Sequence, residues 1–137
     1  MQSARPAEAV DASIWRVARG AGDAEKCPVR DVLDRVGDAW SVLVILLLAE
    51  HGPTRFNALK RAIGDISQRM LAVTLRHLER DGLISRTVFP TNPPQVEYAL
   101  TDLGSSLGDR LGGLTAWAVD NHAPIKAARS EYDARGA

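Results

Sequence analysis

Along most of the chain, apolar residues recur every three or four positions, the spacing that gathers them on one face of an α-helix. The segment "PVRDVLDRVG" carries such a face, opens with Pro28 at a position that suits proline, and stops at Gly37. The next segment, "DAWSVLVILLLAEHG", is apolar on nearly every side and stops at Gly52. The pattern therefore predicts an amphipathic helix followed by a central buried helix.

Two shorter amphipathic segments follow, separated by a break at Gly64. The first, "TRFNALKRAIG", begins at Thr54, which we expect to cap it, and the second begins after Ser67, another favourable cap. At about 100° per residue, the leucines of the second segment lie within one narrow arc and its arginines lie opposite. The outer arc holds Arg69, Val73, Arg76 and Arg80. Both segments are predicted to be helices with an apolar inner face and a basic outer face.

After Gly82 the composition changes to that of strands. "LISRTVFP" and "QVEYALT" are rich in β-branched and aromatic residues, while the prolines of the intervening "TNPP" exclude a strand there. This pattern predicts a β-hairpin with a rigid polar tip. A final helix, capped by Thr101 or Asp102, is predicted to end at Pro124. Its apolar seam consists of Leu103, Leu107, Leu111, Leu114 and Ala118.

The predicted order is helix, helix, helix–turn–helix, hairpin, helix, which is the layout of a winged helix. We therefore expect a mainly α protein with a small β-hairpin, organised as a winged helix-turn-helix. Residues 1–26 are expected to form a weak helix or a disordered extension. Residues 27–122 are expected to form the DNA-binding domain with a C-terminal dimerisation helix, and residues 123–137 a short helix or tail.

Charge is unevenly distributed along a chain that is neutral overall. Residues 54–89 carry seven Lys/Arg and three Asp/Glu, whereas the segments on either side are each net acidic. A basic central third is typical of a surface that meets a polyanion such as nucleic acid. A basic face that is merely solvated is the alternative interpretation.

The chain has a single cysteine, Cys27, so no intrachain disulfide can form, which suits a reducing cytoplasm. The N-terminus shows no signal-peptide pattern. The most apolar run, "VLVILLLA", is far shorter than the roughly 20 residues that a membrane span needs. We therefore expect a cytoplasmic protein that does not enter a membrane.

Several motifs together resemble the HxlR family of bacterial transcription regulators, small winged-helix dimers related to the MarR group. Cys27-Pro28 and the Gly-x-x-Trp of "GDAW" match the first elements of the family. "RFNALKRAIGDISQRMLAVTLRHLERDGLISRTVFPTNPPQVEYALTDLG" matches the rest, from Arg-Phe-x-x-Leu to Leu-Thr-x-Leu-Gly. The resemblance extends from Cys27 to Asn121. It implies a homodimer, joined through its N- and C-terminal helices, that binds a near-palindromic double-stranded operator and regulates transcription, which we expect to be repression.

Base contacts are expected from the outer face of the second helix of the helix-turn-helix, whose N-terminal turns enter the major groove. Gln pairs with adenine, Arg with guanine, and an outward valine can meet a thymine methyl. The base-contact candidates are Ser67, Gln68, Arg69, Val73 and Arg76, and the phosphate-contact candidates are Arg55, Lys60, Arg61, Arg86, Thr91 and Asn92. The rival interpretation is a winged helix that serves protein–protein contact.

Three glycines recur every four residues in the final predicted helix, at Gly104, Gly108 and Gly112. Each costs about 1 kcal/mol of helix propensity relative to alanine. We therefore expect another backbone to pass close by at a dimer interface, the alternative being a weak, kinked helix. The predicted interface residues are Leu107, Leu111, Leu114 and Trp117.

Cys27 has two interpretations that the sequence leaves open. Its place before Pro28, with Lys26 and Arg30 nearby, favours an ionised thiol, and some members of the family use a cysteine here to sense oxidants or electrophiles. The alternative is a small buried residue that fills a gap.

The sequence contains no metal-ligand spacing, no nucleophile–base pair and no phosphate-cradling glycine loop. We therefore expect neither an enzyme nor a cofactor. A pocket for a small-molecule effector near the dimer interface is a further hypothesis, and the sequence does not identify the effector.

Overall fold

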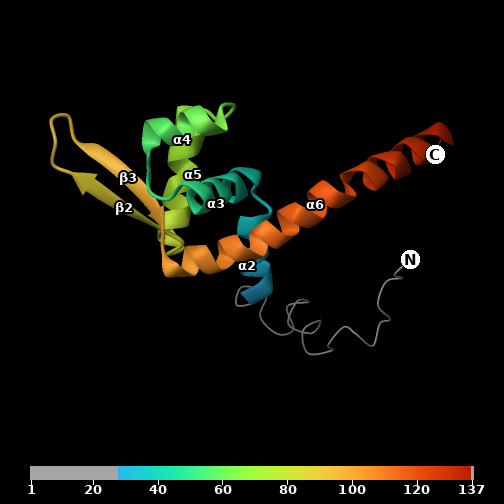
Figure 1. Ribbon diagram of the computed structural model, residues 1–137, viewed down its shortest axis with the longest axis horizontal. Coiled ribbons are helices and arrows are strands. Elements are labelled where there is room, and N and C mark those ends of the chain that lie inside the picture. The colour runs from blue at the N-terminus through green and yellow to red at the C-terminus, as the bar shows by residue number, and fades with distance from the viewer. Residues whose placement is uncertain (1–27, 137) are drawn as a thin grey trace. The chain divides into compact units, whose positions relative to one another are not determined.

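The computed structural model describes residues 28–136, and Figure 1 labels their helices and strands. The chain divides into two compact units, Met1–Val42 and Leu43–Ala137. The second unit contains the helix-turn-helix, the sheet and the C-terminal helix, so it carries most of the predicted functional residues.

The described part of the first unit holds α2 (Pro28–Val36) and the first residues of α3 (Ala39–His51). α2 begins at its proline, as predicted, because the missing N–H of proline is not needed at the first helical position. α3 begins after Asp38, whose carboxylate accepts the backbone N–H of Trp40 at 3.2 Å and the hydroxyl of Ser41 at 2.8 Å. This aspartate therefore caps the start of the central helix.

The second unit continues α3 and adds a helix pair, a small sheet and a long helix. Its further elements are β1 (Thr54–Arg55), α4 (Phe56–Ile63), α5 (Gln68–Arg80), β2 (Ile84–Phe89), β3 (Gln95–Leu100) and α6 (Asp102–Ala134). The predicted winged helix-turn-helix is confirmed: α4 and α5 are the helix pair, and β2 and β3 are the hairpin (Figure 1).

The sheet has three strands rather than the two that were predicted. Its order is β1-β3-β2 with antiparallel pairing, and Thr54 of β1 lies opposite Tyr98 of β3. The predicted capping role of Thr54 is therefore wrong. Its hydroxyl donates to the Gly52 carbonyl at 2.8 Å, and Arg55 occupies the capping position of α4 without a side-chain hydrogen bond. The edge of β3 recruits this backbone into the sheet before the helix starts.

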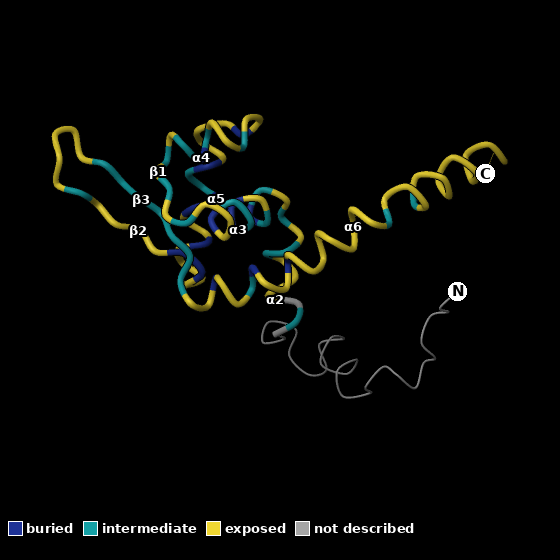
Figure 2. Tube along the Cα trace, in the orientation of Figure 1, coloured by how far each residue is buried: buried dark blue, intermediate teal, exposed yellow. Residues whose placement is uncertain are grey.

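The apolar inner faces of the helices meet in one core within the second unit, shown dark blue in Figure 2. α4 ends at Gly64, whose φ of +87° turns the chain toward α5. The inward arc predicted for α5 is confirmed, since each of its leucines is at most 1% exposed. The core residues of this unit include Val44, Ile45, Leu48, Leu59, Ile66, Leu71, Leu75, Leu78, Leu83 and Ile84.

α6 differs from the predicted C-terminal helix in its length. It starts at the predicted cap, where the hydroxyl oxygen of Thr101 accepts the N–H of Gly104 at 3.1 Å. The predicted end at Pro124 is wrong, because the helix continues through this proline to Ala134. Proline removes one backbone hydrogen bond but keeps a helical φ, so a long helix can continue past it at a local cost.

The three helical glycines have three different surroundings. A Cβ on Gly104 would overlap the carbonyl oxygen of Leu83, whereas a Cβ on Gly108 would lie 3.5 Å from the Ile45 side chain, within ordinary contact. Nothing lies within 4 Å of a Cβ on Gly112. A close backbone approach is confirmed at Gly104, but the approaching backbone belongs to the same chain. The assignment of this glycine to a dimer interface is therefore wrong.

Candidate DNA-binding surface

The outer side of α5 carries what we call the recognition face, defined as the side chains of Gln68, Arg69, Val73 and Arg76. The glutamine and both arginines are exposed, and Val73 is half-buried. The helix begins where predicted, because the hydroxyl oxygen of Ser67 accepts a backbone N–H of the first turn at 3.0 Å. A rigid leucine face beneath these side chains holds the recognition face in place.

α4 contributes basic side chains beside a groove that it shares with the hairpin, which we call the wing (β2, β3 and their connecting tip, residues 90–94). Arg61 is exposed and Lys60 is half-buried. The groove has a volume of about 540 Å³ and is lined by Arg55, Arg61, Asn57 and Pro93, among others. α4, the first helix of the helix-turn-helix, and the wing therefore line one basic depression.

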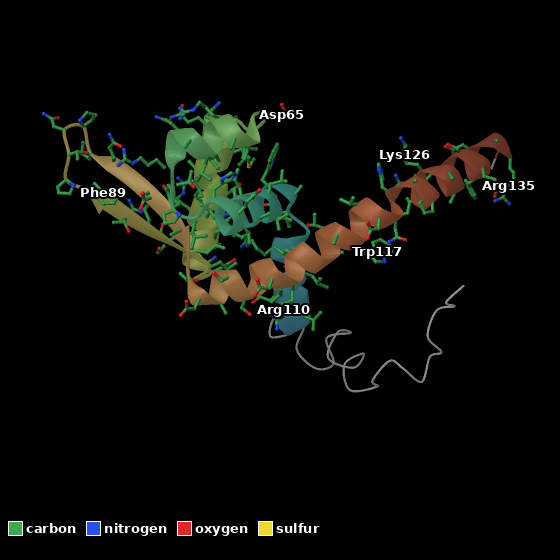
Figure 3. The ribbon with its side chains drawn as sticks, viewed as in Figure 1. Asp65, Phe89, Arg110, Trp117, Lys126 and Arg135 are labelled. Carbon is green, nitrogen blue, oxygen red and sulfur yellow. The ribbon has the colours of Figure 1, made fainter. Side chains whose placement is uncertain are left out.

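The wing tip is a tight polar turn beyond the last strand pair, Phe89 with Gln95. Thr91 donates its hydroxyl proton to the Pro93 carbonyl at 2.7 Å, so this proton is already used within the tip. Asn92 is exposed. Figure 3 labels Phe89 at the base of this tip. Of the two tip residues predicted to contact DNA, the threonine also shapes the turn.

Arg55 is tied to the wing. Its guanidinium donates to the side-chain carbonyl of Gln95 and lies over the Phe89 ring, 5.9 Å from the ring centre. These contacts join β1 to both ends of the wing tip. Arg55, which the sequence marked as a phosphate partner, is therefore also placed to hold the wing against the start of α4.

Arg86 is tied to the recognition helix. Its Nε lies 3.5 Å from Oε1 of Glu79, and the two side chains are 45% and 40% exposed. Arg86 stands on β2 directly opposite Tyr98 of β3. The ion pair therefore bridges α5 and the first strand of the wing.

The pKa of Tyr98 is affected by several charged side chains at the junction of α5 and the wing. Burial raises the pKa of its phenol above the usual value, the positive charges of Arg86 and Arg76 oppose that rise, and the negative charge of Glu79 adds to it. Three charged side chains from α5 and β2 thus act on one half-buried hydroxyl. The charge pattern of α5 alone could have drawn attention to Glu79, because it is the one acid in that helix, but nothing local indicated its pairing with Arg86.

The predicted dimer residues fall into two groups. Leu111 is 3% exposed within the single chain and Leu107 is half-buried, whereas Leu114 and Trp117 are 54% and 57% exposed. The prediction that Leu111 packs against a partner is therefore wrong, because it is already buried in its own chain. From Gly112 onward α6 is almost entirely exposed (Figure 2).

Cys27, the predicted redox residue, lies outside the described residues. Within residues 28–136, no group of three or more His, Cys, Asp or Glu side chains is placed to hold a metal ion. In the same part of the chain, no helix combines the length and the apolar character that crossing a membrane requires.

A helix-turn-helix with a basic, exposed second helix, followed by an antiparallel wing, defines the winged-helix class of DNA-binding regulators. The chain belongs to the HxlR-like helix-turn-helix family, which it matches over residues 35–126. One relative is YtfH from Escherichia coli, an uncharacterized HTH-type transcriptional regulator. It is 43% identical over 108 residues, which cover 79% of this chain and 85% of YtfH.

Solved structures of the same kind are similar along most of the chain. The transcriptional regulator ytfH from Salmonella typhimurium superposes with a TM-score of 0.69 at 40% identity, covering 77% of this chain and 94% of that one. YodB from Bacillus subtilis in its reduced form gives 0.59 at 34% identity, covering 67% and 90%. YodB is also known in diamide-treated and quinone-bound forms. The predicted family is confirmed, and the chain is a winged-helix transcriptional regulator that binds DNA.

Proposed function

We propose that this regulator binds a near-palindromic operator as a homodimer and represses transcription in the cytoplasm, without catalytic activity. The observation that carries the proposal is the recognition face, where Gln68, Arg69 and Arg76 are exposed above leucines that are at most 1% exposed. A protein that recognises base edges in the major groove needs long polar side chains on a rigid helix.

We assign the base contacts to the recognition face and the backbone contacts to its surroundings. Arg61 and Lys60 on α4 have ends that can reach phosphates, and Asn92 is exposed at the wing tip. Such contacts set the register of the protein on the duplex but carry no sequence information themselves. Arg55 is hydrogen-bonded to Gln95 and Arg86 is ion-paired with Glu79, so each would reach a phosphate only by giving up that interaction.

The support for a homodimer is the exposed apolar surface of α6. Leu114 and Trp117, which are three positions apart and therefore on one side of the helix, are each more than half exposed, which is unfavourable in water. We propose that a second copy covers these side chains in an arrangement that presents both recognition faces to one duplex. The two recognition faces would then lie about one turn of DNA, or a small multiple of it, apart.

The test is selection of bound sequences from random duplexes, followed by titration of the enriched site. A palindromic site is expected, with an affinity that falls with salt by a log–log slope of about −0.9 per neutralised phosphate. Arg69→Ala or Arg76→Ala should each cost about 1–3 kcal/mol and relax the preference at one base position per half-site. Arg129→Ala, which removes an equal charge from an exposed site on α6, is the matched control. A salt-insensitive complex, or wild-type selectivity in both recognition-face variants, would contradict the proposal.

A second proposal concerns the signal: oxidants or electrophiles modify Cys27 and release the operator. It is favoured by the similarity to YodB, which has been captured in diamide-treated and quinone-bound forms. In the sequence Cys27 precedes the first residue of α2 and lies near Lys26 and Arg30. A helix start and adjacent positive charge both stabilise a thiolate, which is the reactive form.

The measurement is the rate of thiol alkylation against pH, together with operator binding after diamide or quinone treatment. A pKa below the usual value of about 8.5 and an oxidant-dependent loss of binding are expected. Cys27→Ser should remove that loss while it leaves binding by the untreated protein unchanged. A pKa at or above about 8.5, together with unaltered binding after oxidant treatment, would leave Cys27 as a packing residue and the signal unidentified.

A further inference from the structure

Glu79 is an acid within a helix that otherwise carries only basic charged residues. α5 has the sequence "QRMLAVTLRHLER", in which Glu79 follows Arg76 by three positions and therefore shares one side of the helix with it. Its carboxylate oxygen lies 3.5 Å from Nε of Arg86 on β2. An acid thus stands between an arginine of the recognition face and an arginine of the wing.

The same group of charges is assembled around one point of the sheet. Arg86 stands opposite Tyr98 in the register of β2 and β3. The phenol of Tyr98 is influenced by Arg86, Glu79 and Arg76 together, which places all three near it. The group therefore occupies the junction between the recognition helix and the wing.

The ion pair at this junction is a weak contributor to the fold. Both side chains are close to half exposed, and exposed pairs of this kind are weakened by solvent screening and by the ordering of two long side chains. Little stability is lost when such a pair opens. A DNA phosphate offers the guanidinium a full negative charge and several acceptor oxygens, often in a two-bond arrangement that a single 3.5 Å contact does not provide.

We propose that Glu79 sets the affinity of this protein for DNA by holding Arg86 in the free chain and releasing it to a backbone phosphate on binding. The proposal rests on the DNA-binding function and on the placement of the duplex across α5 and the wing. In the free protein, Glu79 competes with phosphate for the same guanidinium. Because phosphates are the same in every sequence, this competition lowers affinity for all duplexes alike and leaves base preference unchanged.

The test is a double-mutant cycle on the full-length chain with Glu79→Gln, Arg86→Gln and the combined variant. Binding is titrated against the selected operator and against a duplex of equal length and scrambled sequence, over a range of salt. Asp65→Asn is the matched control, since it removes one negative charge from the exposed α4–α5 turn. Asp65 is in none of the ion pairs found among the described residues. Thermal unfolding of each variant checks that the fold is retained.

Glu79→Gln should tighten binding to both duplexes by about twofold to fivefold, the range that corresponds to an exposed pair. Arg86→Gln should weaken binding and reduce the salt slope by about 0.9, the value for one phosphate. In the Arg86→Gln background the Glu79 substitution should then have no effect. Asp65→Asn should change affinity less than Glu79→Gln does.

Three results would overturn the inference. Equal tightening by Glu79→Gln with and without Arg86 would mean that Glu79 acts by plain repulsion of DNA. Weaker binding by Glu79→Gln would mean that the pair positions Arg86 for DNA rather than withholding it. A wild-type protein that binds neither duplex would overturn the proposed function and this inference with it, whereas the first two results leave the proposed function intact.

Discussion

At the scale of single residues, Thr74 is a polar residue buried in an apolar environment. It lies in α5 among the inward leucines and is 1% exposed. Its hydroxyl has no hydrogen-bond partner among the described residues. A buried hydroxyl that loses its bonds to water without replacing them lowers the free energy of unfolding.

Thr74→Val should therefore raise the free energy of unfolding by about 1 kcal/mol, because valine keeps the branched shape and removes the unpaired group. Urea unfolding followed by circular dichroism measures the change. Thr87→Val on the exposed face of β2 is the matched control and should alter stability by less than about 0.5 kcal/mol. A Thr74→Val protein no more stable than wild type would show that the hydroxyl is satisfied in solution.

Tyr98 provides a second prediction at this scale. Burial raises the pKa of its phenol above 10.0, so the folded state favours the protonated form. The resulting stability is fully present below the unfolded pKa and is lost as pH rises through the folded pKa. The chain has two tyrosines, so Tyr132→Phe leaves Tyr98 as the sole phenol. Its absorbance titration should have a midpoint above pH 10.0, and a midpoint at or below that value would contradict the burial argument.

At the scale of elements, the start of α6 is held against the start of β2. Gly104 is buried and its Cα faces the carbonyl of Leu83, and the hydroxyl of Thr101 donates to the carbonyl of Gly82 at 2.6 Å. The absence of a side chain at Gly104 permits this approach. The N-terminal turn of α6 is therefore packed against, and hydrogen-bonded to, the backbone that leads into β2.

Gly104→Ala should lower the free energy of unfolding by on the order of 2–3 kcal/mol, because a Cβ there collides with backbone that cannot move aside cheaply. Gly112→Ala is the matched control in the same helix, where the added methyl meets open space. It should raise stability by about 0.5–1 kcal/mol through helix propensity. Equal effects of the two substitutions in chemical denaturation would refute the close approach of α6 to β2.

At the scale of the whole molecule, the C-terminal part of α6 exposes large apolar side chains to solvent. Figure 3 labels Trp117 on this helix, and the side chain is 57% exposed. Val32 and Leu33 of α2 are also half or more exposed. Covering either of these apolar surfaces lowers the free energy of the protein in water, so both helices are candidates for the contact of the proposed homodimer.

Trp117→Asp should yield a monomer in sedimentation and weaken operator binding by about 100-fold or more, since two linked half-sites are lost together. Ser106→Asp, on the exposed surface nearer the start of α6, is the matched control and should stay dimeric. Leu111→Asp is unsuitable for this purpose, because Leu111 is buried in its own chain. A Trp117→Asp protein that remained dimeric would move the interface to another surface, with α2 the first to examine.

The sequence by itself determined the helix pair, the hairpin and the inward face of α5, although it missed β1 and the continuation of α6 past Pro124. Ser67 and Thr101 begin helices as predicted, and Gly64 ends one. The reason is that helix caps, helix breaks and hydrophobic periodicity act over a few neighbouring residues, so a short stretch of sequence is enough to predict them. The exposed arginines of α5 followed from the same helical periodicity.

Only the tertiary structure decided which distant groups meet. Arg55 and Gln95 are 40 positions apart, and Gly104 lies against Leu83 across the wing. Leu111 has the same apolar character as its exposed neighbours in α6, yet it alone of that seam is buried to 3%. Contacts of this kind depend on how complete elements pack, and packing is a property of three-dimensional shape that no single segment of sequence contains.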